Sequence, residues 1–192
     1  DLVVASLTVP GMERVVMGLA ARGIPQVVLA PRRLSDVKGD LVRCGRAIGV
    51  PEAGLAAEQR FATEMRNLEA AKPVGSPARV YLEWWPRPMF TPGEACFSNE
   101  LIALAGGRNV FGDREGSSLE VSTQDLLAAD PDVCFVSWCG VEAAKLDPQR
   151  VIGREGLEGL RAGRLGAVYP LDERFAGRPG PRMLEASRRM AA

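Results

Sequence analysis

The feature that most constrains the fold is the stretch 55–72, which contains neither glycine nor proline. Alanine, glutamate, arginine and methionine dominate it, and Phe61, Met65 and Leu68 recur at helical spacing, so we predict a helix over these residues. At a rise of about 1.5 Å per residue this helix is about 27 Å long, enough to cross the side of a domain. The segment 73–77, which contains proline and glycine, ends it. A helix of this kind divides the chain into two parts.

The part before the long helix alternates short apolar runs with helical patterns. Apolar runs without polar alternation are typical of a parallel sheet covered on both faces, whose crossovers are right-handed. The expected elements are a strand 2–6, a helix 12–22, a strand 26–30 and a helix from Ser35 or Asp36, as its cap, to about Ile48. This order predicts a β-α-β unit.

The part after the long helix repeats the same alternation. The expected elements are strand 79–85, a Pro-rich loop to Gly93, helix 99–105 capped by Ser98, helix 123–129 capped by Ser122, strand 133–138, helix 154–162, strand 167–170 and helix 183–190. The fold class is therefore α/β, with two parallel-sheet, Rossmann-like lobes joined by one long helix. We assign residues 1–50 to the first lobe, 51–75 to the connecting helix and 76–192 to the second lobe.

Composition excludes several classes of function. The chain has no histidine, which rules out imidazole metal sites and nucleophile systems that use a histidine base. Lysine and arginine number 24, as do aspartate and glutamate, so no net positive charge favours nucleic acid or an anionic membrane. The four cysteines form no C-x-x-C pair, and we predict no metal site. No serine or threonine has a recognisable general base, so we predict no catalytic residue.

The most unusual stretch is 83–93, which contains two of the three tryptophans and follows a predicted strand. Loops beyond the carboxyl ends of strands line the binding crevice in open α/β sheets. Trp85, Arg87 and Phe90 would offer aromatic surface and a cation to a large, partly apolar, anionic ligand. The alternative is that Trp84 packs inward on the sheet and Trp85 covers a helix, with Phe90 filling the space between them.

Two further segments occupy equivalent positions. Trp138 ends the strand 133–138 and is expected to open on the same crevice. Arg174, Phe175 and Arg178 follow the strand 167–170, and their arginines could bind a carboxylate or phosphate. The alternative for this last segment is a surface loop of solvated charges joined by local ion pairs.

Several segments of the chain resemble a known family. They are 1–4, 79–83, 90–93, 99–111, 121–122, 126–133 and 180–185. They are similar to the periplasmic substrate-binding proteins of vitamin B12 and ferric-siderophore ABC importers, a helical-backbone type of metal receptor. Members of that family begin with a further stretch, so the resemblance implies that the first lobe is incomplete here and that the export signal lies outside this chain.

The resemblance also implies how the site is built. Two lobes bridged by one rigid helix would hold the ligand between facing loops, with Ser6 and Leu7 on the first lobe. Phe90, Trp138 and the segment 174–178 would face them from the second. The family docks its transporter through a surface glutamate on each lobe, and the second of these aligns near Gln124, beside Asp125.

We therefore expect this chain to be the substrate-binding component of an ABC importer. It would capture cobalamin, another corrinoid or an iron–siderophore chelate. Its partners would be that ligand and the importer permease, and not nucleic acid. We expect no cofactor, no enzymatic activity and no direct insertion into the membrane. Its location would be periplasmic or otherwise extracytoplasmic, with or without a lipid anchor. The alternatives are a chelatase-like, metal-handling enzyme and a cytosolic chelate sensor on the same fold.

Overall fold

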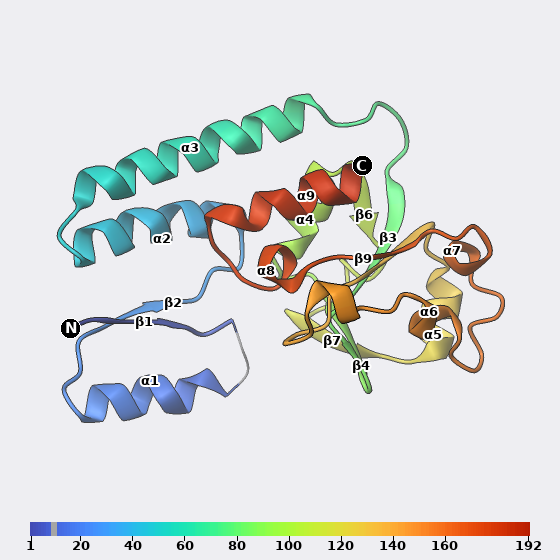
Figure 1. Ribbon diagram of the computed structural model, residues 1–192, viewed down its shortest axis with the longest axis horizontal. Helices are drawn as coiled ribbons and strands as arrows, with labels where there is room; N and C mark the ends of the chain where they lie inside the picture. The colour runs from blue at the N-terminus through green and yellow to red at the C-terminus, as the bar shows by residue number, and fades with distance from the viewer. Residues whose placement is uncertain (9–10) are drawn as a thin grey trace. The chain divides into compact units, whose positions relative to one another are not determined.

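The computed structural model describes residues 1–8 and 11–192. The chain divides into two compact units, Asp1–Glu64 and Met65–Ala192, called here the first and the second unit. The long helix α3 (Pro51–Ala70) runs through the boundary between them (Figure 1). It begins at Pro51, earlier than predicted, because proline at the first helical position loses no hydrogen bond and has a helical φ angle.

The first unit is built on two paired strands. Strand β1 (Val3–Ser6) pairs in parallel with β2 (Gln26–Leu29), and helix α1 (Met12–Ala21) connects them. Helix α2 (Leu34–Ala47) follows β2. The predicted β-α-β unit is therefore confirmed.

The start of α2 differs from the prediction. The helix begins at Leu34, before the predicted cap, because the Asp36 carboxylate accepts hydrogen bonds from the backbone N–H groups of Arg32 (2.9 Å) and Arg33 (3.0 Å). Asp36 stabilises the helix from inside its first turn. Ser35 is not the cap.

Helices α2 and α3 approach each other closely inside the first unit. A β-carbon added to Gly45 would lie 2.7 Å from the Gly54 Cα atom, which is shorter than real contacts allow. The two glycines therefore permit the close packing of these helices. Among the described residues of this unit, the buried apolar side chains include Ala5, Leu34, Val37 and Phe61.

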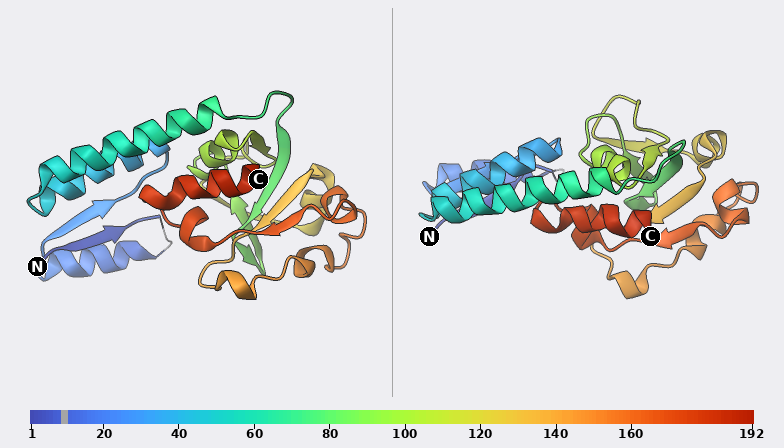
Figure 2. Two further views of the ribbon diagram at one scale, coloured as in Figure 1. Left: turned by 45° about the horizontal axis from the view of Figure 1, so that its top comes forward. Right: turned by 90° about the horizontal axis from the view of Figure 1, so that it is seen from above.

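The second unit contains a parallel sheet in the order β6-β3-β8-β9. The strands are β3 (Ala78–Glu83), β6 (Gly107–Asn109), β8 (Val133–Val136) and β9 (Val168–Pro170). Helices α4 (Ser98–Leu104) and α9 (Leu184–Ala191) pack against each other on one side of the sheet (Figure 2). The Ser187 hydroxyl of α9 donates to the Leu101 carbonyl of α4 (2.8 Å). The predicted parallel sheet is confirmed.

The other face of this sheet carries a large buried cluster. Tyr81, Cys134 and Val136 point into it from the strands, since alternate residues of a strand face the same side. Helices α5 (Thr123–Ala129), α6 (Gln149–Ile152) and α7 (Arg161–Arg164) each contribute to it. The second unit therefore has apolar packing on both faces of its sheet.

A small antiparallel sheet replaces the predicted Pro-rich loop. Strands β4 (Trp85–Pro86), β5 (Met89–Pro92) and β7 (Ser118–Val121) pair in the order β4-β5-β7. Prolines lie within β4 and at the end of β5, and residues of this type weaken the sequence signal for strands.

The predicted helix 154–162 is wrong. Gly156 has a φ angle of 86°, which favours glycine and interrupts a right-handed helix. Leu157 and Leu160 are buried within an irregular segment between α6 and α7. The apolar residues of this segment are core residues without the helix that was predicted for them.

Other boundaries shift by a few residues. The predicted Ser98 cap is wrong, because α4 begins at Ser98 itself and its N–H group donates to the Cys96 thiol (3.4 Å). The Ser122 cap of α5 is confirmed by a hydrogen bond from the Asp125 N–H group (3.1 Å). The remaining short helices are η1 (Ala143–Lys145), α8 (Glu173–Ala176) and η2 (Pro181–Met183). Within residues 1–8 and 11–192, no helix has the length and apolar character needed to cross a membrane.

Candidate functional site at the carboxyl edge of the second unit

Three segments meet beyond the carboxyl ends of neighbouring strands in the second unit. They are 84–92 after β3, 137–142 after β8 and 171–178 after β9, and together we call them the carboxyl edge. Hydrogen bonds join them: Cys139 N–H to the Trp84 carbonyl (3.1 Å) and Gly140 N–H to the Glu173 carboxylate (2.7 Å). Leu171 N–H also donates to the carbonyl of Val136, the last residue of β8 (2.8 Å). The expected grouping of these segments is therefore found.

The hairpin of β4 and β5 carries the aromatic part of this edge. Trp85 lies opposite Phe90 in the antiparallel pair, and its side chain is 43% exposed. The Trp85 indole N–H group donates to the Arg87 carbonyl (3.0 Å), which closes the turn. Phe90 is half-buried and Arg87 is exposed. The hairpin thus offers aromatic and cationic surface on an internally bonded turn.

Glu83 lies directly before this hairpin and is completely buried. Its carboxylate accepts two hydrogen bonds from the Arg154 guanidinium (2.5 and 2.6 Å), one from the Trp138 indole (2.8 Å) and one from the Tyr81 hydroxyl (3.0 Å). The same guanidinium also lies 2.8 Å from the Met89 sulfur atom. One buried carboxylate therefore connects two parallel strands, the hairpin and the segment after α6.

The expectation that Trp138 opens on a crevice is wrong. Its side chain is only 4% exposed and belongs to the buried cluster. It points inward because its indole N–H group, which needs a partner when buried, bonds to Glu83. Trp85, in contrast, is 43% exposed.

The Glu83 network changes the ionisation of its neighbours. Burial, followed by the charge of Glu83, raises the pKa of the Tyr81 hydroxyl well above its ordinary value. The same two causes raise the pKa of the Cys134 thiol to about 12. Burial alone would lower the pKa of Arg154, but hydrogen bonds to Glu83 and its charge raise it. Tyr81 and Cys134 are therefore neutral near pH 7.

The segment after β9 holds the predicted arginines. The Arg174 guanidinium bonds to the Asp172 carboxylate (2.6 Å), which lowers the pKa of that carboxyl group. Arg178 is more loosely paired with Glu173 (3.4 Å). Phe175 is half-buried, and the Arg174 guanidinium carbon lies 5.6 Å from its ring centroid. Both arginines are exposed, as the surface-loop alternative also expects.

In the first unit, Ser6 and Leu7 lie at the carboxyl end of β1. The Ser6 hydroxyl is hydrogen-bonded to the Thr8 hydroxyl (2.8 Å), and Leu7 N–H donates to the Leu29 carbonyl (2.8 Å). Ser6 and Leu7 are half-buried.

The predicted docking residues lie on α5. Gln124 is exposed, whereas Asp125 uses both carboxylate oxygens within the second unit. One oxygen accepts from the Ser122 N–H (2.9 Å) and hydroxyl (2.6 Å) groups, and the other from the Arg114 guanidinium (2.9 Å). These bonds lower the pKa of Asp125 to about 2.

The cysteines supply no evident ligand set. All four are free, and Cys139, at the carboxyl edge, is exposed. Burial and then the charge of Glu173 raise the pKa of the Cys139 thiol, which makes it a poorer nucleophile and ligand. The described part of the chain contains no cluster of three or more cysteine, aspartate or glutamate side chains suited to a metal ion.

The family model of the periplasmic binding proteins matches residues 2–175. The chain belongs to the periplasmic binding protein family.

Among curated relatives, this periplasmic binding protein is 25% identical over 176 residues to the vitamin B12-binding protein of Yersinia pestis (strain Pestoides F). The alignment covers 90% of this chain and 58% of the relative, so the chain spans somewhat more than half the length of that protein.

Solved structures agree on the fold. The periplasmic vitamin B12-binding protein of Vibrio cholerae matches with a TM-score of 0.78 at 22% identity, covering 100% of this chain and 72% of that one. The periplasmic heme-binding protein of Roseiflexus sp. RS-1 matches with a TM-score of 0.81 at 24% identity, covering 99% and 73%. The two-lobed α/β fold class is therefore shown.

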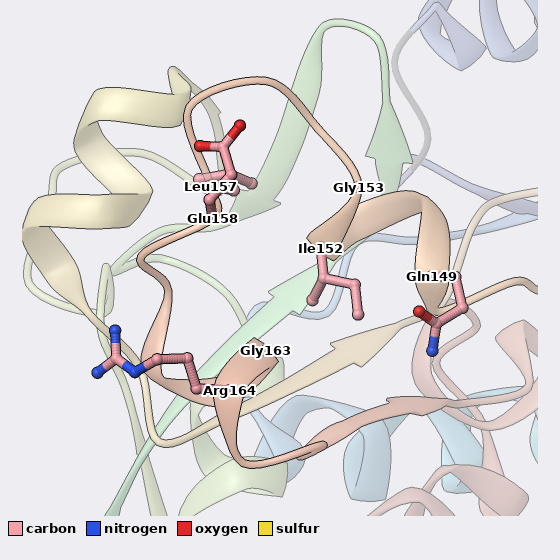
Figure 3. Close-up of a pocket in the computed structure, with 7 residues that line it drawn as sticks. All are labelled: Gln149, Ile152, Gly153, Leu157, Glu158, Gly163 and Arg164. Atoms are coloured by element: carbon pink, nitrogen blue, oxygen red, sulfur yellow. The ribbon is translucent and has the colours of Figure 1, made fainter.

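A pocket of about 470 Å³ lies elsewhere in the second unit of this periplasmic binding protein (Figure 3). Its walls come from α6, α7 and the segment between them, with Ile152, Leu157 and Arg164 among them. None of the predicted ligand-binding residues lines it.

Sequence reasoning missed Glu83 and Arg154 as parts of the site. A signal for the first was present, since Glu83 is a charged residue ending the apolar strand 80–82 and must find a partner if buried. Arg154 lies far along the chain in a segment predicted as a helix, so no local pattern could pair the two.

Proposed function

We propose that this chain forms the ligand-capturing part of an ABC-importer binding protein for a cobalamin-type corrinoid or an iron chelate. The observation that carries the proposal is the match of the family model over residues 2–175. The names of the relatives, which bind vitamin B12 or heme, support this ligand class. Such ligands are large and partly apolar and carry polar or anionic groups.

The carboxyl edge suits that chemistry. Trp85 and Phe90 present aromatic surface on a hairpin whose turn is closed by its own hydrogen bond, so little conformational entropy is lost on binding. Arg87, Arg174 and Arg178 are exposed cations that can pair with carboxylate or phosphate groups of a ligand. On our proposal, Ser6 and Leu7 contribute from the first unit. Trp138 supports the edge from inside rather than contacting the ligand.

Capture requires no covalent chemistry. The family consists of binding proteins, and we propose that this chain is likewise not an enzyme and uses no cofactor of its own. The permease of the importer would be its macromolecular partner, with Gln124 and Asp125 in the contact. Asp125 could contribute only by sharing oxygens that Ser122 and Arg114 already use. The location would be extracytoplasmic.

Isothermal titration of the complete protein tests this proposal. The probes are cyanocobalamin, hemin and a ferric hydroxamate chelate, each titrated separately. We expect at least one to bind with a dissociation constant below about 10 μM, equivalent to roughly 7 kcal/mol. If none of the three binds at that level, the proposed function is wrong.

A further inference from the structure

We propose that the Glu83–Arg154 pair is a positioning device that sets the shape of the carboxyl edge for ligand binding. The role in ligand binding rests on the proposed function. The contacts themselves all lie within the second unit. The Glu83 side chain is completely buried and that of Arg154 is only 13% exposed, so we assign neither a contact with the ligand. Each would act through the segments to which it is bonded.

The bonds of Glu83 reach both sides of the edge. Glu83 is the last residue of β3, and its carboxylate holds the Trp138 indole at the start of the segment 137–142. The backbone of the next residue, Cys139, bonds to the Trp84 carbonyl (3.1 Å), so the two segments share one fixed register. Loss of the carboxylate therefore removes the bond that holds the Trp138 side chain, although the backbone bonds between the segments remain.

Arg154 holds the hairpin from its other strand. Its guanidinium donates two parallel hydrogen bonds to Glu83 and contacts the sulfur atom of Met89, the first residue of β5. Met89 pairs with Pro86 across the hairpin and precedes Phe90. One planar cation thus bonds to the end of β3, before the hairpin, and contacts the return strand β5.

The type of contact explains why these two residues are needed. A guanidinium bonded through two nitrogens to a carboxylate fixes orientation as well as distance, which an ammonium group cannot do. The Arg154 side chain is 13% exposed and Glu83 is not exposed at all, so water competes little with these bonds. A site held by such a buried contact keeps its shape before the ligand arrives.

A pair that only stabilises the fold and a pair that positions the carboxyl edge would affect ligand affinity differently. If the pair only stabilised the fold, variants would unfold more easily but the folded fraction would bind as before. If the pair positions the edge, the folded protein itself would bind less well. The test therefore needs a control variant that is destabilised elsewhere.

The variants are Glu83→Gln, which removes the charge at almost constant size, and Arg154→Lys, which keeps the charge but not the planar fork. The control is Leu101→Ala in α4, a fully buried residue outside the buried cluster that contains Tyr81 and Trp138. All are made in the complete protein. Binding of cyanocobalamin, hemin and the ferric hydroxamate chelate is measured well below the unfolding midpoints.

We expect Glu83→Gln and Arg154→Lys to weaken binding of the bound probe by about tenfold or more, because a site is sensitive to small displacements of its supports. Leu101→Ala should keep the dissociation constant within about twofold, since distant sites act independently. Unchanged affinity in both Glu83→Gln and Arg154→Lys would overturn the inference.

Amide hydrogen exchange provides a second readout that needs no ligand. In Arg154→Lys, segments 84–92 and 137–142 should exchange about tenfold faster, while Leu101→Ala leaves them unchanged. If the unaltered protein binds no probe but this local effect appears, the proposed function fails and the positioning role stands. If exchange in these segments does not change, the positioning role is wrong even where ligand binds.

Discussion

The two units differ in how completely helices cover the faces of their parallel strands. In the second unit, helices pack on both faces of the sheet, and the strands β3 and β8 and the helices α4, α5, α6, α7 and α9 contribute buried residues. In the first unit, α1 buries no residue, and Val4 of β1 and Met17 of α1 are 53% and 64% exposed. The difference teaches that the second unit holds its own hydrophobic core, whereas the described residues of the first leave apolar surface facing solvent.

The two units should differ in how much stability is lost when an apolar side chain of a sheet-covering helix is truncated, and this is the largest effect expected. Leu101→Ala in the second unit should lower the free energy of unfolding by about 2–5 kcal/mol, because it leaves a cavity under a sheet that is fully covered. Met17→Ala in the first unit is the matched control and should change it by no more than about 0.5 kcal/mol. Urea denaturation followed by circular dichroism measures both. Equal losses would show that the first unit is packed as well as the second.

A smaller effect is expected where the first unit is tightly packed. Gly45→Ala places a β-carbon 2.7 Å from the Gly54 Cα atom and 2.9 Å from its nitrogen, so α2 and α3 must move apart at a cost of about 1–3 kcal/mol. Gly39→Ala, in the same helix with no atom within 4 Å, should instead stabilise by roughly 0.5–1 kcal/mol. Thermal unfolding of the two variants should therefore shift in opposite directions. A shift in the same direction would contradict the close contact between the helices.

The smallest effect concerns the cap of α5 in the second unit. Ser122→Ala should cost about 1 kcal/mol, since it removes the side chain that accepts the Asp125 N–H group. The pKa of Asp125 is about 2, below its ordinary value of 3.8, so its contribution is present above pH 3.8 and lost as the pH falls to about 2.

The direction of this pH dependence of stability can be tested with Asp125→Asn. The variant should be less stable than the unaltered protein at pH 6, and the difference should shrink between pH 4 and pH 2. A difference that stays constant over this range, in denaturation curves recorded at each pH, would show that the Asp125 carboxylate does not hold the cap.

The sequence predicted the order of the main elements because buried strands and amphipathic helices leave strong local patterns. Strands 3–6, 26–29, 78–83 and 133–136 and the helix Pro51–Ala70 all lie close to their predicted places. The predicted helix 154–162 failed because Leu157 and Leu160 are core residues without regular structure.

The candidate site was less predictable because its supports act over long distances in the chain. The position of Trp85 and Phe90 after a strand was readable, since it depends on local order. The inward turn of Trp138 depends on Glu83, and the partner of Glu83 is Arg154, which is separated from it by 71 residues. Contacts of this kind leave no periodic pattern in the sequence.

The central claim is that the aromatic hairpin of the second unit binds the solute. Isothermal titration of the complete protein, with Trp85→Ala and Phe90→Ala and whichever of the three probes binds, tests it most directly. At least one substitution should weaken binding by about 1 kcal/mol or more while the unfolding midpoint stays close to that of the unaltered protein. Unchanged affinity in both variants would contradict the account and assign these two side chains to packing alone.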